Sequence, residues 1–205
     1  MNMIVTETAK PMVTPEGQAR NDEIFLTAAQ LMVEKGYGAT SISDIAKAVG
    51  MTKAGLYHHI RSKQDMLFQI LKFAMKGLEC EVIEPAKRLT DPEARLRETI
   101  RLHVRGLFKH GLEFSLLFPE QRHLGAEQQE VVTKLIENYL ELLHGAMEEL
   151  AAEGKLRDLD IKIASRHILQ TIAGIARWYS KDTMPLDLLV EQTVNYNLSA
   201  ILKDS

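Results

Sequence analysis

The sequence predicts an all-α protein with a small N-terminal and a larger C-terminal domain. Apolar residues recur at helical spacing through most of the 205 residues, and strict alternation of apolar and polar residues is absent. Gly and Pro residues separate these stretches at the positions where helices end and begin. A hydrophobic content of 45% and a charged content of 26% are ordinary for a globular protein. We therefore expect about nine helices.

Composition and the first residues exclude several classes of protein. No run reaches about 18 uninterrupted apolar residues, so we expect no contact with a membrane. The first residues, MNMIVTETAKPMVTPEG, lack the basic and apolar regions of a secretory signal. Cys80 is the single cysteine, which favours a reducing compartment. We therefore expect a cytoplasmic protein.

The N-terminal domain is expected to start with a flexible arm and one helix. Pro and Gly interrupt residues 1–19, which we interpret as the arm. Asn21 or Asp22 is suited to cap the first helix, and Gly36 is typical of its end. The apolar face of this helix consists of Ile24, Ala28, Leu31 and Met32.

Three capped helices follow, and the first two have the spacing of a helix-turn-helix over residues 41–60. Ser41 with Asp44 forms a capping-box pattern, Thr52 caps the next helix after a turn at Gly50, and Ser62 caps a helix that continues to about Leu78. The inward positions are Ile42, Ile45, Ala46 and Val49, then Leu56 and Ile60. A generic helical hairpin within a bundle is the alternative to a helix-turn-helix.

Residues 69–205 are expected to form the larger helical domain. A break is predicted at residues 85–92, where Pro85, Thr90, Asp91 and Pro92 cluster. Helices are then expected from Pro92 to Phe108, over 112–118, from Gly125 to Leu150, from Asp158 or Asp160 to Tyr179, and from Pro185 to Ile201.

Charge is distributed unevenly along the chain. Between Thr40 and Lys63 there are four basic residues and one acidic residue, which gives this segment a net charge of +3 and leaves −6 for the rest of the −3 chain. A local basic surface is typical of a nucleic-acid contact.

Residues 24–67 read IFLTAAQLMVEKGYGATSISDIAKAVGMTKAGLYHHIRSKQDML. This run resembles the DNA-binding domain of the TetR family of bacterial transcription regulators, in which an A-A pair, G-Y/F-x-x-T-S, D-I-A, A-G-V/M-S/T-K and L-Y-x-H-F-x-S/N-K-x-x-L follow one another. Val49 and Gly50 stand where the family has A-G, and Ile60 replaces the usual Phe; the apolar roles are preserved. The rest of the chain resembles the family only in length and helical character.

The resemblance implies a DNA-binding domain over residues 20–68 that contacts double-stranded operator DNA. Lys53, Ala54 and Gly55, with Ser43, would face the bases, since Lys donates to guanine and small residues allow close approach. Tyr57, His58 and His59 would contact phosphates, as would Lys63 at the start of its helix. Thr40, Ser41 and Thr52 complete the predicted set.

Two-fold dimers on pseudo-palindromic operators are the usual arrangement for such domains. The resemblance implies a homodimer through the last two helices, over about residues 160–202. Small residues and one apolar face support this: Ala164, Ser165, Ala173, Gly174 and Ala176, then Leu189, Thr193, Tyr196 and Ala200. The alternative is that both stripes belong to the core of one chain.

The resemblance also implies an effector pocket in the larger domain, whose occupation releases DNA. A mostly apolar lining with a few polar groups is typical of small-molecule sites, so we expect a fatty acid or an acyl-CoA thioester. The alternative is a drug-like compound that controls a repressor of an efflux operon. No cofactor or metal is expected. The candidate residues are His103, Leu107, Phe108, His110, Phe114, Leu117, Phe118, Arg122, Tyr139, Leu143, Ile168, Ile172, Ile175 and Trp178.

Catalytic motifs are absent, so we expect no enzyme and no catalytic residues. H-E-x-x-H, a Gly-rich phosphate loop and G-x-S-x-G do not occur. His103 and His110 lie about 10 Å apart along one helix, too far to share a metal. A helix-turn-helix that contacts only proteins is a second alternative. In the DNA-binding interpretation, the helix that begins at Lys63 would carry the effector signal to the DNA.

Overall fold

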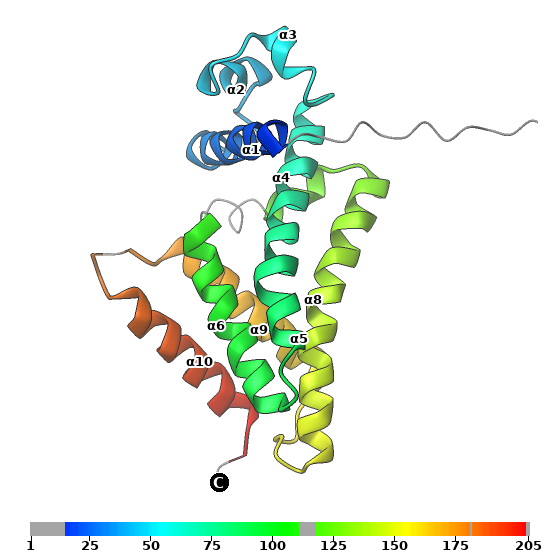
Figure 1. The fold of residues 1–205 in the computed structure, drawn as a ribbon, viewed down its shortest axis with the longest axis vertical. Helices are drawn as coiled ribbons and strands as arrows, with labels where there is room; N and C mark the ends of the chain where they lie inside the picture. The colour runs from blue at the N-terminus through cyan, green and yellow to red at the C-terminus, as the bar shows by residue number, and fades with distance from the viewer. Residues whose placement is uncertain (1–14, 111–117, 181, 204–205) are drawn as a thin grey trace, which may run out of the picture.

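The computed structural model describes residues 15–110, 118–180 and 182–203, and their side chains except those of residues 15–18 and 110. Within these ranges the chain forms nine α-helices and three short π- or 3-10-helical segments, and no strand, as the helical spacing predicts (Figure 1). Helices α1 to α3 gather at one end of the molecule, and α4 runs from them into a bundle with α6, α8 and α9.

Helix caps form the N-terminal part where the sequence predicts them. The helices are α1 (Pro15–Lys35), α2 (Ile42–Ala48), α3 (Lys53–Leu56) and α4 (Lys63–Leu78). Ser41, Thr52 and Ser62 each accept a hydrogen bond from a backbone N–H in the first turn of α2, α3 and α4. Ser41 and Asp44 form the full capping box. α3 is a single helical turn.

Helix α1 begins earlier than the predicted cap at Asn21 or Asp22. It starts at Pro15, so residues 15–19 of the predicted arm are helical, while residues 1–14 lie outside the described residues. Proline suits the first position of a helix because its N–H would be unpaired there. The Arg20 guanidinium donates to the Val49 carbonyl at 2.9 Å, which ties this added part of α1 to the end of α2.

The predicted break over 85–92 is confirmed at residues 88–91, and α6 starts at Pro92 as predicted, but Pro85 itself does not end the helix. α4 passes into a π-helical segment, Glu79–Ile83, and then into α5 (Glu84–Lys87), which contains Pro85. A proline inside an α-helix removes one hydrogen bond and clashes with the carbonyl four residues earlier. The wider π turn directly before it changes that spacing, so the chain stays helical up to Lys87.

The C-terminal part consists of long helices and two 3-10 segments. They are α6 (Pro92–His110), η2 (Phe118–His123), α8 (Ala126–Ala152), α9 (Ile161–Gly174), η3 (Ile175–Arg177) and α10 (Leu186–Ile201). Asp91 and Asp160 accept from the first turns of α6 and α9. The predicted helix over 112–118 falls largely outside the described residues.

Two buried clusters divide the interior, and their border does not coincide with residue 68. One cluster joins α1 to α4, but it also contains Leu124 and Val132, which come from the end of η2 and the start of α8. The other joins η1, α6 and α8 to α10. Ile136 contacts both clusters. Helices α1 to α3 therefore pack on the C-terminal bundle through α4 and through the segment around Leu124.

Candidate functional site

The helix-turn-helix is stabilised by its caps and by two buried anchors. Gly50 ends α2 with φ of +67°, a left-handed conformation that glycine adopts without strain. Leu56 and Ile60 are buried in the N-terminal cluster, as their spacing predicts. They fix the orientation of α3, so its remaining side chains point away from the core.

The side chains exposed on this part include most of the predicted DNA contacts. Exposed residues of the set are Ser41, Ser43, Thr52, Lys53, Ala54, Tyr57, His58 and His59, and Gly55 is partly exposed. A Cβ on Gly55 would lie 3.2 Å from the Thr52 hydroxyl that caps α3, so a small residue at this position also serves the fold.

The side chains of three predicted DNA-contacting residues, Thr40, Ser41 and His59, form hydrogen bonds within the chain. The Thr40 hydroxyl is buried and donates to the Gly36 carbonyl at 2.9 Å, and Ser41 donates to the Asp44 carboxylate at 2.6 Å. That bond and others hold the pKa of Asp44 down at about 2. The His59 ring lies 2.8 Å from the Asn21 side-chain oxygen. These side chains stabilise the surface that carries the other predicted contacts.

Lys63 lies at a junction between the N-terminal helices and the C-terminal bundle. Its ammonium donates to the carbonyls of Tyr37 (2.9 Å) and Gly38 (3.1 Å), and it lies 4.6 Å from the centre of the Tyr37 ring. The other partner of that ring is His123 of η2, stacked at 5.0 Å. Gln64 donates to the His123 carbonyl at 2.6 Å. This junction connects the turn after α1 to η2.

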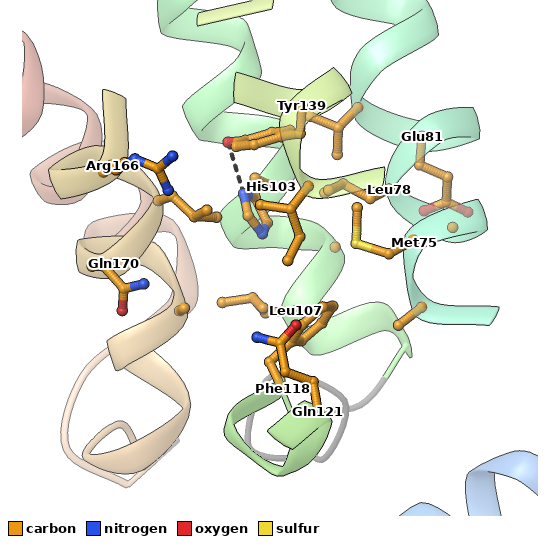
Figure 2. A pocket seen from close by; sticks show the side chains of 17 residues that line it. Met75, Leu78, Glu81, His103, Leu107, Phe118, Gln121, Tyr139, Arg166 and Gln170 are labelled. Atoms are coloured by element: carbon orange, nitrogen blue, oxygen red, sulfur yellow. Dashed lines mark hydrogen bonds between the residues drawn. The ribbon is translucent and has the colours of Figure 1, made fainter. Parts of the chain in front are cut away.

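A cavity of about 410 Å³ lies between α4, η1, α6, η2, α8 and α9 (Figure 2). Its apolar walls include Met75 and Leu78 from α4, Leu107 from α6 and Phe118 from η2. The volume is in the range of small-molecule sites, roughly 300–1,000 Å³. The α4 residues belong to the helix that follows the helix-turn-helix directly, so one structural element connects the cavity to that motif.

Polar groups stand at different places around this cavity. His103 and Tyr139 form a buried pair, with His103 Nδ1 and the Tyr139 hydroxyl oxygen 2.8 Å apart. Glu81 accepts from the Lys109 ammonium at 2.6 Å on the α4 side. Arg166 and Gln170 on α9 are exposed while they line the cavity. Figure 2 shows Arg166 and Glu81 on opposite sides.

The structure places four predicted pocket residues in the cavity wall and the others elsewhere. His103, Leu107, Phe118 and Tyr139 line it. Leu143, Ile168, Ile172 and Ile175 are buried in the C-terminal core and do not line the cavity. Phe108 packs edge-to-face on Tyr179, Trp178 is exposed, and Arg122 pairs with Glu120 on the surface. Phe114, Leu117 and the His110 side chain lie outside the described residues.

Sequence reasoning missed the face that α9 presents to the cavity. Arg166, Leu169, Gln170 and Ala173 line it, at the i, i+3, i+4 and i+7 positions of one face. The predicted pocket residues Ile168, Ile172 and Ile175 lie on the neighbouring, more apolar face, which packs in the core. The available signal was a mixed polar and apolar stripe beside a fully apolar one, because a pocket wall needs both kinds of side chain.

The predicted dimer helices combine buried and exposed residues. Ser165, Leu189 and Thr193 are buried within the chain's own core. The large apolar side chains exposed on α9 and α10 are Ile163 (56% exposed), Leu188 (48%) and Tyr196 (67%). Of the predicted positions, Ala164, Ser165, Leu189 and Thr193 therefore pack within one chain, whereas Tyr196 and Ala200 are exposed.

A helix-turn-helix joined by one helix to an effector-sized cavity defines a class of ligand-responsive DNA-binding regulators. Residues 24–70 match the model for bacterial regulatory proteins of the tetR family, and residues 89–200 match the model for a tetracyclin repressor-like C-terminal domain. The second match alone covers more than half of the chain. The chain belongs to the TetR family, and members of this family bind operator DNA as dimers with small-molecule effectors.

Named relatives agree with this assignment over most of the chain. It is 27% identical over 185 residues to the HTH-type transcriptional repressor KstR2 of Rhodococcus jostii (strain RHA1), covering 89% of this chain and 91% of the relative. It is 25% identical over 163 residues to a fatty acid metabolism regulator protein of Bacillus subtilis (strain 168), covering 78% and 84%. The crystal structure of AibR with isovaleryl coenzyme A and operator DNA superposes with a TM-score of 0.78 at 29% identity, covering 86% and 97%.

Two further properties of the described residues concern membranes and metals. In the part of the chain that the structure describes, no helix has the length and apolar character needed to cross a bilayer. Over the same residues, no group of three or more His, Cys, Asp or Glu side chains is arranged to hold a metal ion.

Proposed function

We propose that the protein is a repressor that leaves its operator when an acyl thioester, such as an acyl-coenzyme A, occupies the cavity beside α4. The observation that carries this proposal is the position of the cavity: Met75 and Leu78, on the helix that starts at the DNA-facing end, form part of its wall. An effector that packs against α4 changes the position of the helix-turn-helix relative to its partner copy. Since operator DNA is its target, the protein works in the cytoplasm.

The character of the cavity supports an amphipathic effector. An acyl chain fits the apolar surfaces of Met75, Leu78 and Leu107. The exposed Arg166 on α9 is suited to the phosphates of a coenzyme A head group, because a guanidinium binds phosphate with two parallel hydrogen bonds. AibR, which has been crystallised with isovaleryl coenzyme A and operator DNA, and the fatty acid metabolism regulator support the same effector class.

On DNA, we assign base contacts to Lys53, Ala54 and Gly55, with Ser43 beside them, because α3 presents its first turn outward. Tyr57 and His58 bind phosphates, since both are exposed beyond that turn. Lys63 uses two of its three ammonium protons on the Tyr37 and Gly38 carbonyls, which leaves one for phosphate.

Two copies are needed to hold two recognition helices on successive major grooves, about 34–36 Å apart. We place the contact between copies on α9 and α10, within residues 160–202. The exposed apolar side chains Ile163 and Tyr196 support this choice, because association buries such surface.

We propose two connections between the cavity and the DNA-facing end. One is α4 itself. The other is η2, where Phe118 and Gln121 line the cavity and His123, at the end of the same segment, stacks on Tyr37. A ligand that moves η2 changes the support of the turn that follows α1.

The test is a fluorescence-anisotropy titration of a DNA duplex selected by the protein from random sequence, with and without isovaleryl- and octanoyl-coenzyme A. A coupling of roughly 1–3 kcal/mol, typical of allosteric proteins, lowers DNA affinity by about 5–150-fold. Unchanged affinity at saturating concentrations of both thioesters would overturn the proposed effector class, and failure to select any DNA would overturn the repressor.

A further inference from the structure

His103 is a polar side chain built into the apolar wall of the cavity. It is 8% exposed, and its ring meets the Tyr139 ring edge-to-face with the centroids 5.0 Å apart. Its Nδ1 is 2.8 Å from the Tyr139 hydroxyl. The other ring nitrogen, Nε2, has no hydrogen-bond partner among the described residues, and Figure 2 shows it pointing away from Tyr139 into the cavity.

The hydrogen bond to Tyr139 determines which nitrogen of His103 carries the proton. Tyr139 is fully buried, and His103 is the acceptor that the described residues offer to its hydroxyl. If Nδ1 donated to Tyr139 instead, the phenolic proton would be left without an acceptor, which is costly in a buried position. The hydroxyl therefore donates to Nδ1, and Nε2 carries the proton that points into the cavity.

The donor presented by Nε2 is uncharged. Burial lowers the pKa of His103 to about 4, so the imidazole is neutral at neutral pH. A neutral N–H in an apolar wall is satisfied by a carbonyl oxygen, which brings no net charge with it. A carboxylate at the same place would be desolvated beside an uncharged donor, with the carboxylate of Glu81 also in the cavity wall.

We propose that His103 is the specificity-determining residue of the effector site: its Nε2–H donates to the carbonyl oxygen of an acyl thioester, and Tyr139 is a positioning residue that holds the tautomer. This inference rests on the proposed function, because it assumes that an acyl thioester occupies this cavity. It adds the atom that distinguishes a thioester from other compounds with the same chain. The selected chemistry is a neutral carbonyl attached to an apolar chain.

The test compares effectors that differ only in the carbonyl oxygen. Isovaleryl-coenzyme A is compared with S-isopentyl-coenzyme A, its thioether, and octanoyl-coenzyme A with S-octyl-coenzyme A. The measured quantity is the effector concentration that releases half of the bound DNA, expressed as a thioether-to-thioester ratio. In the unchanged protein we expect a ratio of roughly 10, the value of one buried hydrogen bond.

Variants of His103 and its neighbours test whether the thioether-to-thioester ratio depends on His103. His103→Phe keeps a ring but removes the donor, so the ratio is expected to fall to about 1, while His103→Gln supplies an N–H again and restores part of it. Tyr139→Phe frees the tautomer and lowers the ratio to an intermediate value. Leu107→Ala, a change in the apolar wall, weakens thioester and thioether alike and leaves the ratio at roughly 10. Thermal unfolding checks that each variant is folded.

Each result decides between the two proposals. Equal potency of thioester and thioether in the unchanged protein, or an unaltered ratio in both His103 variants, overturns the role of His103 and leaves the thioester effector standing. Release by neither thioester overturns the proposed effector class and this inference together. A free carboxylate, isovalerate or octanoate, that releases DNA as well as its thioester also overturns the inference.

Discussion

The helix-turn-helix and the effector cavity are built by different rules. Residues 41–60 are organised by contacts close in sequence: Ser41 with Asp44, and Thr52 with Gly55. The cavity is organised by contacts far apart in sequence, such as His103 with Tyr139 and Lys109 with Glu81. Its walls come from α4, α6, α8 and α9, together with two shorter segments.

This difference decides what each region can tolerate and what its sequence reveals. A local motif has few alternative arrangements, so its residues keep recognisable spacings. A cavity lined from several helices depends on how whole helices are rotated against each other, which no short spacing specifies. We therefore expect substitutions in the two regions to separate DNA binding from effector response.

The largest difference in effect between the two regions is expected when a buried Leu is changed to Ala in each. Leu56→Ala removes a fully buried side chain from the N-terminal cluster, which costs about 2–5 kcal/mol of unfolding free energy and abolishes operator binding. Leu107→Ala enlarges the cavity, so operator binding without effector is retained while effector release weakens. Urea unfolding and DNA anisotropy measure the two effects.

An exposed position provides the control for Leu56. Val131→Ala changes an exposed side chain of α8 and is expected to alter stability by less than about 0.5 kcal/mol. If Leu56→Ala and Leu107→Ala impaired operator binding equally, the two regions would not be separable in this way.

Sequence prediction succeeded where side chains act on their own helix. The caps at Ser41, Thr52 and Ser62 and the buried pair Leu56 and Ile60 follow from spacing alone. The family followed from the resemblance of residues 24–67 to its DNA-binding domain. The predicted start of α1 at Asn21 or Asp22 was wrong, because the helix begins at Pro15. The contact from Arg20 to the Val49 carbonyl joins residues 29 apart, so local spacing does not predict it.

Prediction of the cavity failed where tertiary packing decides. Ile168, Ile172 and Ile175 are as apolar as a pocket wall should be, yet they face the core, and Arg166 with Gln170 line the cavity instead. Pro85 failed as a helix breaker because the π-helical turn before it cannot be recognised from residue types. His103 and Tyr139 were found, but their pairing needed the structure.

Acid should act on the two regions at different pH. The ordinary pKa of His103 is 6.5 and burial lowers it to about 4, so below about pH 6.5 the unfolded chain binds a proton there that the folded chain does not. Acidification from pH 6.5 to 4 therefore favours unfolding, by up to about 3 kcal/mol from this group. The capping box behaves differently: hydrogen bonds from Ser41 lower the pKa of Asp44 from 3.8 to about 2, so its contribution is lost only as the pH falls from about 3.8 to 2.

Urea unfolding at a series of pH values measures this dependence. In His103→Phe the titrating group is gone, so the fall in stability between pH 6.5 and 4 is expected to shrink by the contribution of His103. An identical pH dependence in this variant and the unchanged protein would show that other groups cause the loss.

A substitution in η2 should weaken the coupling between effector binding and DNA binding. His123→Ala removes the ring stacked on Tyr37, so we expect effector to lower DNA affinity less, by a coupling smaller by about 1 kcal/mol. Operator binding without effector and effector binding without DNA should change little. Glu127→Ala is the control, because this side chain is exposed in the first turn of α8, close to η2 in sequence. Unchanged coupling in His123→Ala would leave α4 as the proposed connection.

The smallest expected effect concerns the number of phosphates held at the DNA-facing end. Lys63 and Lys72 both lie on α4 with the ammonium over an aromatic ring, at 4.6 Å from Tyr37 and 5.2 Å from Phe68. Lys63 is at the DNA-facing end of α4, and Lys72 is more than two turns further along the helix. Because each phosphate neutralised contributes about −0.9 to the slope of log affinity against log salt, Lys63→Ala should make that slope shallower by about 0.9, and Lys72→Ala should leave it unchanged.

The same pair of variants separates the two roles of Lys63. The bonds to the Tyr37 and Gly38 carbonyls contribute to folding, so Lys63→Ala also lowers the urea midpoint. A lower midpoint with an unaltered salt slope would mean that the ammonium only supports the turn after α1. The phosphate contacts would then be made by Tyr57 and His58. Lys63, although charged, would contribute to DNA binding only by stabilising the local structure of the N-terminal helices, which would strengthen the contrast between the two regions.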